Sequence, residues 1–110
     1  MNEQFLQSNR ITSLRKLHST YSFRIDSDGD FPEITVWVWE LFNPDLKQEY
    51  RFEAAVSHDI QNSKQGSPYS PMPIEVSPER AFEMAVHGFM QMFDGPTTKV
   101  TKRKAQQAAS

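Results

Sequence analysis

The chain contains no cysteine, only four glycines and no long uninterrupted hydrophobic segment among its 110 residues. Without cysteine, the chain has no disulfide framework, no thiolate-ligated zinc or iron–sulfur site and no thiol nucleophile. The longest apolar stretch, residues 34–42, is interrupted by Thr35 and Glu40 and is far shorter than the roughly 20 residues that span a bilayer. The first residues have neither the basic opening nor the apolar stretch of a signal peptide. We therefore expect a soluble protein of a reducing compartment, the cytoplasm.

The small formal net charge of −2 conceals an uneven distribution of charge along the chain. Residues 1–25 carry a net charge of +3, residues 26–94 carry −9, and residues 95–110 carry +4. An acidic body repels a phosphate backbone, so the pattern restricts any contact with nucleic acid to the two basic ends. The candidate cations for such a contact are Arg10, Arg15, Lys16, Lys102, Arg103 and Lys104.

The hydrophobic residues of the first segment are spaced as in an amphipathic helix. Leu6, Ile11, Leu14, Leu17 and His18 fall within about 140° of one another at 100° per residue. The spacing therefore predicts an N-terminal helix.

Beyond this segment the hydrophobic period changes to two, which is typical of half-buried strands. Strands are predicted over residues 21–25, 33–42 and 47–57, and the second is densest in β-branched and aromatic residues. The pair Asp28-Gly29 favours a tight hairpin turn between the first two. Together these segments predict a three-stranded antiparallel meander.

A proline-rich segment and a second helix follow the meander. Four prolines within residues 68–78 predict a long loop over 59–77, to which Ile74 and Val76 contribute a short edge strand. Ser77 is a suitable N-cap for a helix that runs to Phe93.

The predicted fold class is α+β, with an N-terminal helix, a three-stranded antiparallel meander, a long Pro-rich loop and a C-terminal helix packed on the sheet. Residues 1–95 are predicted to form one domain, and residues 96–110, which lack apolar spacing, a basic disordered tail.

Two predicted elements carry more apolar surface than one small core requires. In the second strand, Ile34, Val36 and Val38 share one face, which leaves Trp37 and Trp39 on the opposite face. Three covers for these tryptophans stay open: the first helix, a second subunit, or a ligand stacked on the exposed rings.

The second predicted helix is apolar over roughly 240° of its circumference, more than the packing on one sheet face needs. Its methionines are adaptable residues that suit changeable binding surfaces. The candidate partner-binding residues from the two elements are Trp37, Trp39, Arg51, Met84 and Met90.

The sequence contains no motif that points to catalysis, a metal or a cofactor. The run of residues 26–30 begins like a calcium loop but lacks the glycine and the closing glutamate that such a loop requires. His58 and Asp59 are adjacent at a strand end, which suits a solvated turn as well as a metal ligand or a general base. The leading hypothesis is therefore a small non-enzymatic protein-interaction protein (an adaptor, regulator or inhibitor) that forms a homodimer. The alternative is a nucleic-acid-binding accessory protein that uses its basic ends and stacks bases on Trp37 and Trp39.

Overall fold

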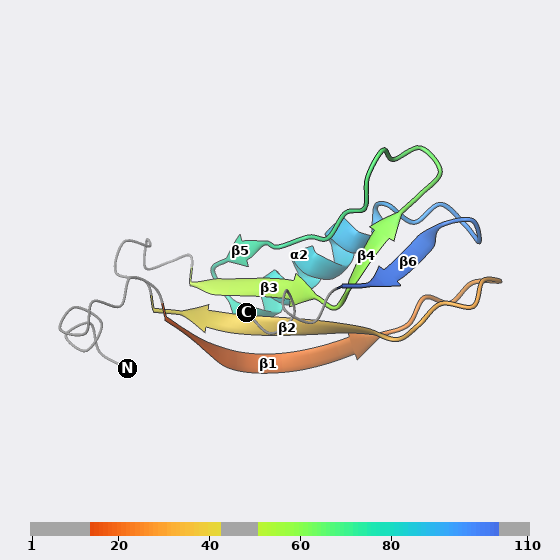
Figure 1. Cartoon of the computed structure of the whole chain (residues 1–110). Coiled ribbons are helices and arrows are strands. Elements are labelled where there is room, and N and C mark those ends of the chain that lie inside the picture. The colour runs from red at the N-terminus through yellow and green to blue at the C-terminus, as the bar shows by residue number, and fades with distance from the viewer. Residues whose placement is uncertain (1–13, 43–50, 104–110) are drawn as a thin grey trace.

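The computed structural model describes residues 14–42 and 51–103, which form one helix and six strands arranged in two antiparallel sheets. The four-stranded sheet has the order β1-β2-β3-β5, with β1 at Arg15–Phe23, β2 at Ile34–Leu41, β3 at Phe52–Val56 and β5 at Ile74–Glu75. The two-stranded sheet pairs β4 (His58–Gln61) with β6 (Lys99–Lys102), and the helix is α2 (Pro78–Met90). Figure 1 shows the four-stranded sheet with α2 behind it and the β4–β6 pair to one side. The described part of the chain is therefore α+β with antiparallel strands.

The hydrophobic core lies between α2 and the four-stranded sheet. The alternation in β2 turns Ile34, Val36 and Val38 toward the helix, where none of the three is exposed to solvent. Phe89 of α2 is equally buried and meets the ring of Phe23 edge-on, with 5.8 Å between ring centroids. The other fully buried core residues are Ala54, Val56, Ile60, Ala81 and Ala85. The predicted core face of the second strand is thus confirmed.

Helix α2 begins where the sequence predicts. The Ser77 hydroxyl accepts a hydrogen bond of 3.1 Å from the backbone N–H of Arg80, which satisfies one of the free donors of the first turn. The predicted end at Phe93 is wrong, because the helix ends at Met90. The N–H groups of Met92 and Phe93 bond to carbonyls three residues earlier, so the chain leaves the helix in tighter turns.

The predicted N-terminal helix is wrong over the part that the structure describes. Residues 15–18 belong to strand β1, which pairs antiparallel with β2. The register shifts between Leu17 and Ser19, so a β-bulge at His18 interrupts the ladder. Residues 1–13, which hold the rest of the predicted helix, lie outside the described residues.

The meander itself is confirmed, but the connection between its first two strands is longer than predicted. Strands β1, β2 and β3 are neighbours in sequence order and antiparallel. The predicted two-residue turn is wrong, since residues 24–33 all lie between β1 and β2. Within this connection the Ser27 hydroxyl accepts a hydrogen bond from the N–H of Gly29 at 3.0 Å.

The segment predicted as a loop over residues 59–77 contains more regular structure than expected. It begins inside β4, Tyr69 forms an isolated bridge with Ile60, and the predicted edge strand appears as β5. Pro71 is buried, and a Cβ placed on Gly88 of α2 would lie 3.2 Å from its side chain. The proline-rich chain therefore lies against a side of α2 that the sheet does not cover.

The predicted disordered tail also contains a strand. Residues 99–102 form β6, and the ladder places Val100 opposite Ile60. Val100 has almost no apolar neighbours in sequence, so the strand is defined by its pairing with β4 and by packing against the core. Residues 104–110 lie outside the described residues.

Helix α2, the helix of the described segments, is not long and apolar enough to cross a membrane.

Candidate functional site: the outer face of the sheet

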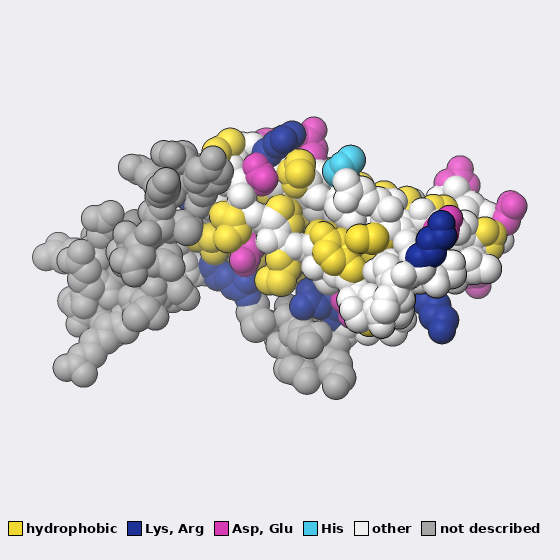
Figure 2. All heavy atoms as spheres, turned by 90° about the horizontal axis from the view of Figure 1, so that it is seen from above, with side chains coloured by type: hydrophobic (Ala, Val, Ile, Leu, Met, Phe, Trp, Pro, Cys, Tyr) yellow, Lys and Arg dark blue, Asp and Glu magenta, His cyan; other side chains and the backbone are white. Residues whose placement is uncertain are grey.

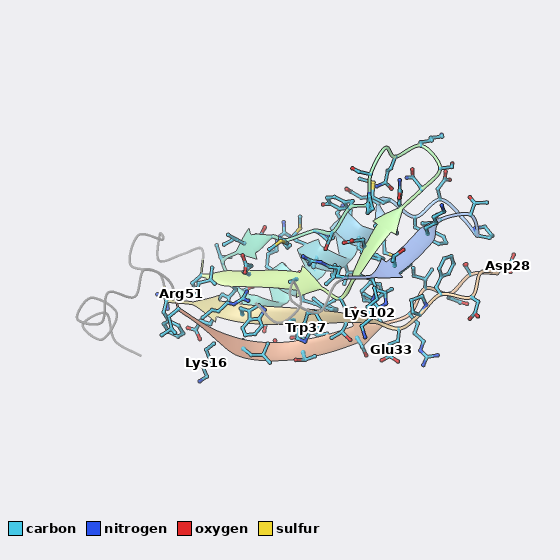
Figure 3. The ribbon with its side chains drawn as sticks, in the orientation of Figure 1. Lys16, Asp28, Glu33, Trp37, Arg51 and Lys102 are labelled. Atoms are coloured by element: carbon cyan, nitrogen blue, oxygen red, sulfur yellow. The ribbon has the colours of Figure 1, made fainter. Side chains whose placement is uncertain are left out.

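The face of the four-stranded sheet that points away from α2 carries both tryptophans of the chain. Figure 3 shows Trp37 on the side of β2 opposite the helix. The ladder sets Trp37 between Thr20 of β1 and Ala55 of β3, and Trp39 between Leu17 and Glu53. We call this surface the outer face, made of Arg15, Leu17, Thr20, Ser22, Thr35, Trp37, Trp39, Glu53, Ala55 and Ile74.

None of the described elements packs over the outer face. The helix, which could have provided a cover, lies on the other side of the sheet (Figure 1). Leu17 and Ile74 are 44% and 41% exposed, while the two tryptophans are partly buried. Of the three predicted covers for the tryptophans, a helix that includes Leu14 and Leu17 is excluded. Leu17 lies within β1, and Leu14 directly precedes this strand.

Trp39 is held in a network of charge and aromatic contacts. The guanidinium of Arg15 lies 4.2 Å from the centroid of the Trp39 ring, in cation–π geometry. The same guanidinium forms an ion pair of 3.3 Å with Glu53, the cross-strand neighbour of Trp39. Arg15 and Glu53 are only 28% and 18% exposed, so the pair orders the Trp39 end of the face better than a solvated pair would.

Arg51, the third candidate partner-binding residue, lies at the start of the β3 segment (Figure 3). Its guanidinium lies 4.0 Å from the carboxylate of Glu40. The N–H of Leu41 donates to the Arg51 carbonyl at 2.7 Å, which fixes the backbone next to the outer face. Arg51 thus lies directly before β3, next to the end of the strand that carries Trp37 and Trp39.

Met84 and Met90 are not part of this surface. Both belong to α2, on the other side of the sheet, and Met90 packs against the core cluster. The surplus apolar surface predicted for this helix is reduced by the buried Pro71 and by Tyr21, whose ring stacks on Phe82 at a centroid distance of 4.2 Å. The space-filling view from the β5 side shows hydrophobic side chains in several patches divided by polar and charged groups (Figure 2).

A second group of polar residues lies where the two sheets diverge. Ser57 and His58 are each only 8% exposed, so a solvated turn, one of the alternatives left open for His58 and Asp59, is excluded at His58. Burial, assisted by the charge of Lys102, lowers the pKa of His58, and the imidazole is therefore neutral at neutral pH. The Ser57 hydroxyl accepts a hydrogen bond from the N–H of Thr35 at 2.9 Å and shares a second hydrogen bond with Nδ1 of His58 at 2.6 Å.

This serine–histidine contact has the residue types of a nucleophile and its base, but its surroundings indicate a structural role. Ser57 is buried and its hydroxyl already accepts a hydrogen bond from the Thr35 N–H. The backbone around it is also fully engaged, since Ser57 N–H donates to the Thr35 carbonyl and its own carbonyl accepts from Arg103 N–H. The contact fixes the backbone between β3, which pairs with β2, and β4, which pairs with β6.

The cations predicted to bind phosphate are dispersed. Arg15 lies on Trp39, whereas Arg103 is directed into the fold, where it donates to the Val56 carbonyl and the Ser70 hydroxyl at 3.3 Å each. Lys16 and Lys102 are exposed on separate strands. Arg10 and Lys104 lie outside the described residues.

A polar hollow of about 330 Å³ lies between the turn that follows β4 and the start of β6. Its side chains bond one another and the nearby backbone, as in the 2.7 Å bond from Asn62 N–H to the Gln65 side-chain oxygen. No buried side-chain nitrogen or oxygen in the described ranges lacks a hydrogen-bond partner, and none of these residues form a group of three metal-ligating side chains. The hollow is lined by Gln61, Asn62, Ser63, Gln65, Thr97 and Lys99.

Comparison with models of known protein families, with curated proteins and with solved structures gave no match.

Proposed function

We propose that the chain is a small non-enzymatic protein-interaction protein, an adaptor, regulator or inhibitor, that binds a partner protein through the outer face. One observation carries the proposal: both tryptophans lie on a sheet face that no described element covers. Tryptophan and arginine are the residues that most often dominate the binding energy of protein interfaces.

The composition of the outer face supports a protein partner. Its centre is aromatic, and beside this centre it carries charges of both signs in the ion pair Arg15–Glu53. An aromatic centre with a polar rim is the usual anatomy of a protein–protein interface. The cation–π contact and ion pair of Arg15 hold Trp39 in one orientation before binding, which reduces the entropy that a partner must offset.

The alternative function, nucleic-acid binding with Trp37 and Trp39 as a stacking surface, is less well supported. Arg15, the arginine that contacts Trp39, is paired with Glu53, a carboxylate that a phosphate backbone would have to approach. Of the predicted phosphate contacts, Arg103 is already bonded within the fold. Among the described candidates, Lys16 and Lys102 are exposed, but they lie on strands of different sheets.

The test uses the full chain as bait in an extract of its source cells, treated with nuclease. The Trp37→Thr variant removes the central ring and keeps a β-branched residue in the strand. Glu83→Ala, at an exposed position of α2 on the other side of the sheet, is the matched control. We expect the same protein to be retained by the wild type and by Glu83→Ala, and its affinity for purified Trp37→Thr to fall about 30-fold, as for a hot spot of about 2 kcal/mol.

Circular dichroism of each variant shows whether the fold is intact. The proposal is wrong if a folded Trp37→Thr variant binds every retained protein as tightly as the wild type. Retention that disappears with nuclease favours the nucleic-acid alternative, which predicts an affinity that falls steeply with salt concentration.

A further inference from the structure

Strand β1 is an open edge of the four-stranded sheet. It is nine residues long and, in the part of the chain that the structure describes, β2 is its only partner strand. The opposite edge is formed by β5, which is only two residues long. In Figure 1, β1 forms the lower border of the sheet, with no described strand beyond it. A long unpaired edge offers backbone donors and acceptors to another strand.

The hydrogen bonds between β2 and β3 identify which backbone groups of β1 point away from β2. Leu41 N–H donates to the carbonyl of Arg51, and Ser57 N–H donates to that of Thr35, so odd-numbered residues of β2 turn their backbone toward β3. Even-numbered residues of β2 therefore turn toward β1, where their partners are Ser19, Tyr21 and Phe23. The backbone groups of the intervening residues, Thr20 and Ser22, consequently point away from the sheet.

Part of the edge is protected and part is not. Lys16 and the bulge at His18 are features that discourage pairing along the first half of β1. From Ser19 to Phe23 the ladder with β2 is regular and the residues are uncharged. On the helix side of this segment, Tyr21 is only partly buried and lies against Phe82. The open segment is therefore Ser19–Phe23, with an aromatic border on the side of α2.

The charges at the two ends of β1 are opposite. The strand begins with Arg15 and Lys16, whereas residues 24–33, the connection that follows it, carry Arg24 together with Asp26, Asp28, Asp30 and Glu33, a net charge of −3. Figure 3 shows Lys16 and Asp28 at opposite ends of the molecule. An edge that is basic at one end and acidic at the other is self-complementary in the antiparallel orientation, because each basic end then lies near the acidic end of the other copy. A parallel arrangement would place like charges together.

We propose that two copies of the chain associate through β1, which pairs antiparallel with β1 of the second copy along Ser19–Phe23. With the two-fold axis at Tyr21, Thr20 of one copy faces Ser22 of the other, and both residues have outward-pointing backbone groups, as the ladder requires. The two four-stranded sheets become one continuous sheet with both helices on the same side. The two Tyr21 side chains meet at the axis, where cross-strand aromatic pairs are favourable.

The proposed dimer uses outward-pointing backbone groups of Thr20 and Ser22, whereas the proposed partner site uses side chains of the outer face, to which both residues also belong. No described element of either copy covers Trp37 or Trp39 in the dimer, so partner binding does not require self-association. The failure of one leaves the other intact.

The experiment measures the molar mass of the full chain by sedimentation equilibrium from about 1 µM to about 1 mM, a range that covers weak to moderate affinities. Thr20→Pro removes an outward-pointing N–H, and proline is tolerated at such edge positions. We expect a concentration-dependent dimer for the wild type and a monomer for Thr20→Pro. Thr20→Val, which keeps the N–H and a β-branched side chain, is the matched control and should still dimerise.

A charge exchange tests the orientation independently, in case Thr20→Pro fails to fold. Lys16→Glu and Asp26→Lys should each weaken the dimer about threefold to tenfold, since each change affects two symmetric rim contacts. The double variant should regain most of the lost affinity. A wild type that stays monomeric over the whole range overturns the proposal. So does a dimer that neither Thr20→Pro, if folded, nor the charge reversals weaken.

Discussion

The Cα of Gly88 lies against Pro71, so that a Cβ on this glycine would sit 3.2 Å from the proline side chain and 3.4 Å from the Tyr69 hydroxyl. Gly88 is inside α2, where glycine is unfavourable by about 1 kcal/mol relative to alanine. The close approach of the proline-rich segment leaves little room for a side chain at this position.

We predict that Gly88→Val destabilises the protein by about 1–3 kcal/mol, because the added methyl groups force Pro71 away from the helix. Glu83→Val, at an exposed position of the same helix, should change the free energy of unfolding by no more than about 0.5 kcal/mol. Urea unfolding of both variants measures the difference. Equal stability of the two would mean that the segment does not press on the helix.

The buried His58 predicts a dependence of stability on pH. Its pKa is lower in the folded state than its ordinary value of 6.5, mainly because of burial. The unfolded chain therefore binds the proton more readily, and the free energy of unfolding falls as the pH drops below about 6.5. The decrease ends below the folded-state pKa of His58, where both states are protonated.

The measurement compares denaturant unfolding of the wild type and His58→Gln between about pH 7.5 and pH 5.5. Glutamine can still accept a hydrogen bond from Ser57 but does not titrate, so the variant should lose most of the slope. Glu33 does not interfere: hydrogen bonds from Ser22 and Arg24 lower its pKa from 4.5, so its stabilising contribution is lost only at a lower pH. An unchanged slope in His58→Gln would show that another group is responsible.

Arg103 is predicted to stabilise the fold although it lies in a basic, sequence-terminal segment. It donates to the Val56 carbonyl and the Ser70 hydroxyl and approaches Asp59 at 3.8 Å, with only 14% of its side chain exposed. Arg103→Ala should lower the free energy of unfolding by about 1–3 kcal/mol. Lys102→Ala, at the neighbouring exposed position, should have little effect on the free energy of unfolding. Thermal unfolding of the two variants shows whether Arg103 stabilises the fold or only adds surface charge.

The N-cap of α2 gives a further prediction. Ser77→Ala removes the acceptor of the Arg80 N–H and should cost about 1 kcal/mol, whereas Ser77→Asp should retain the cap and most of the stability. Chemical denaturation of both variants is the measurement. Equal losses in the two would argue against the cap.

Local chemistry made α2 and β2 predictable from the sequence. The cap at Ser77 and the alternation of Ile34, Val36 and Val38 depend on residues that are close in sequence, and the structure confirms both. The same alternation predicted that Trp37 and Trp39 share the face opposite the core. That part of the candidate site needed no knowledge of long-range contacts.

The first part of β1 was missed because a bulge changes its period. With an extra residue at His18, Leu17 lies on the outer face while Ser19 and Tyr21 lie on the helix side, so simple alternation fails across the bulge. The spacing of Leu14, Leu17 and His18 then matched a helix equally well. Pairing with β2, which is a tertiary interaction, decides the outcome.

The sequence also did not predict β6 or the hydrogen bonds of Ser57. β6 has a single apolar residue, Val100, and exists through its pairing with β4, about forty residues earlier in the chain. The contacts of Ser57 with Thr35 and Arg103 likewise join distant segments. Sequence patterns report on neighbours along the chain and contain little information about such contacts.

The position of the two tryptophans has an optical consequence. The chain has no tryptophan besides Trp37 and Trp39, and both lie on the sheet face opposite the helix, whereas the aromatic residues of the core are phenylalanines and a tyrosine. Light absorbed near the red edge of the protein spectrum therefore excites the outer face alone. The emission of the native protein is a built-in reporter of whatever approaches that face, and it does not sense directly the repacking on the side of α2.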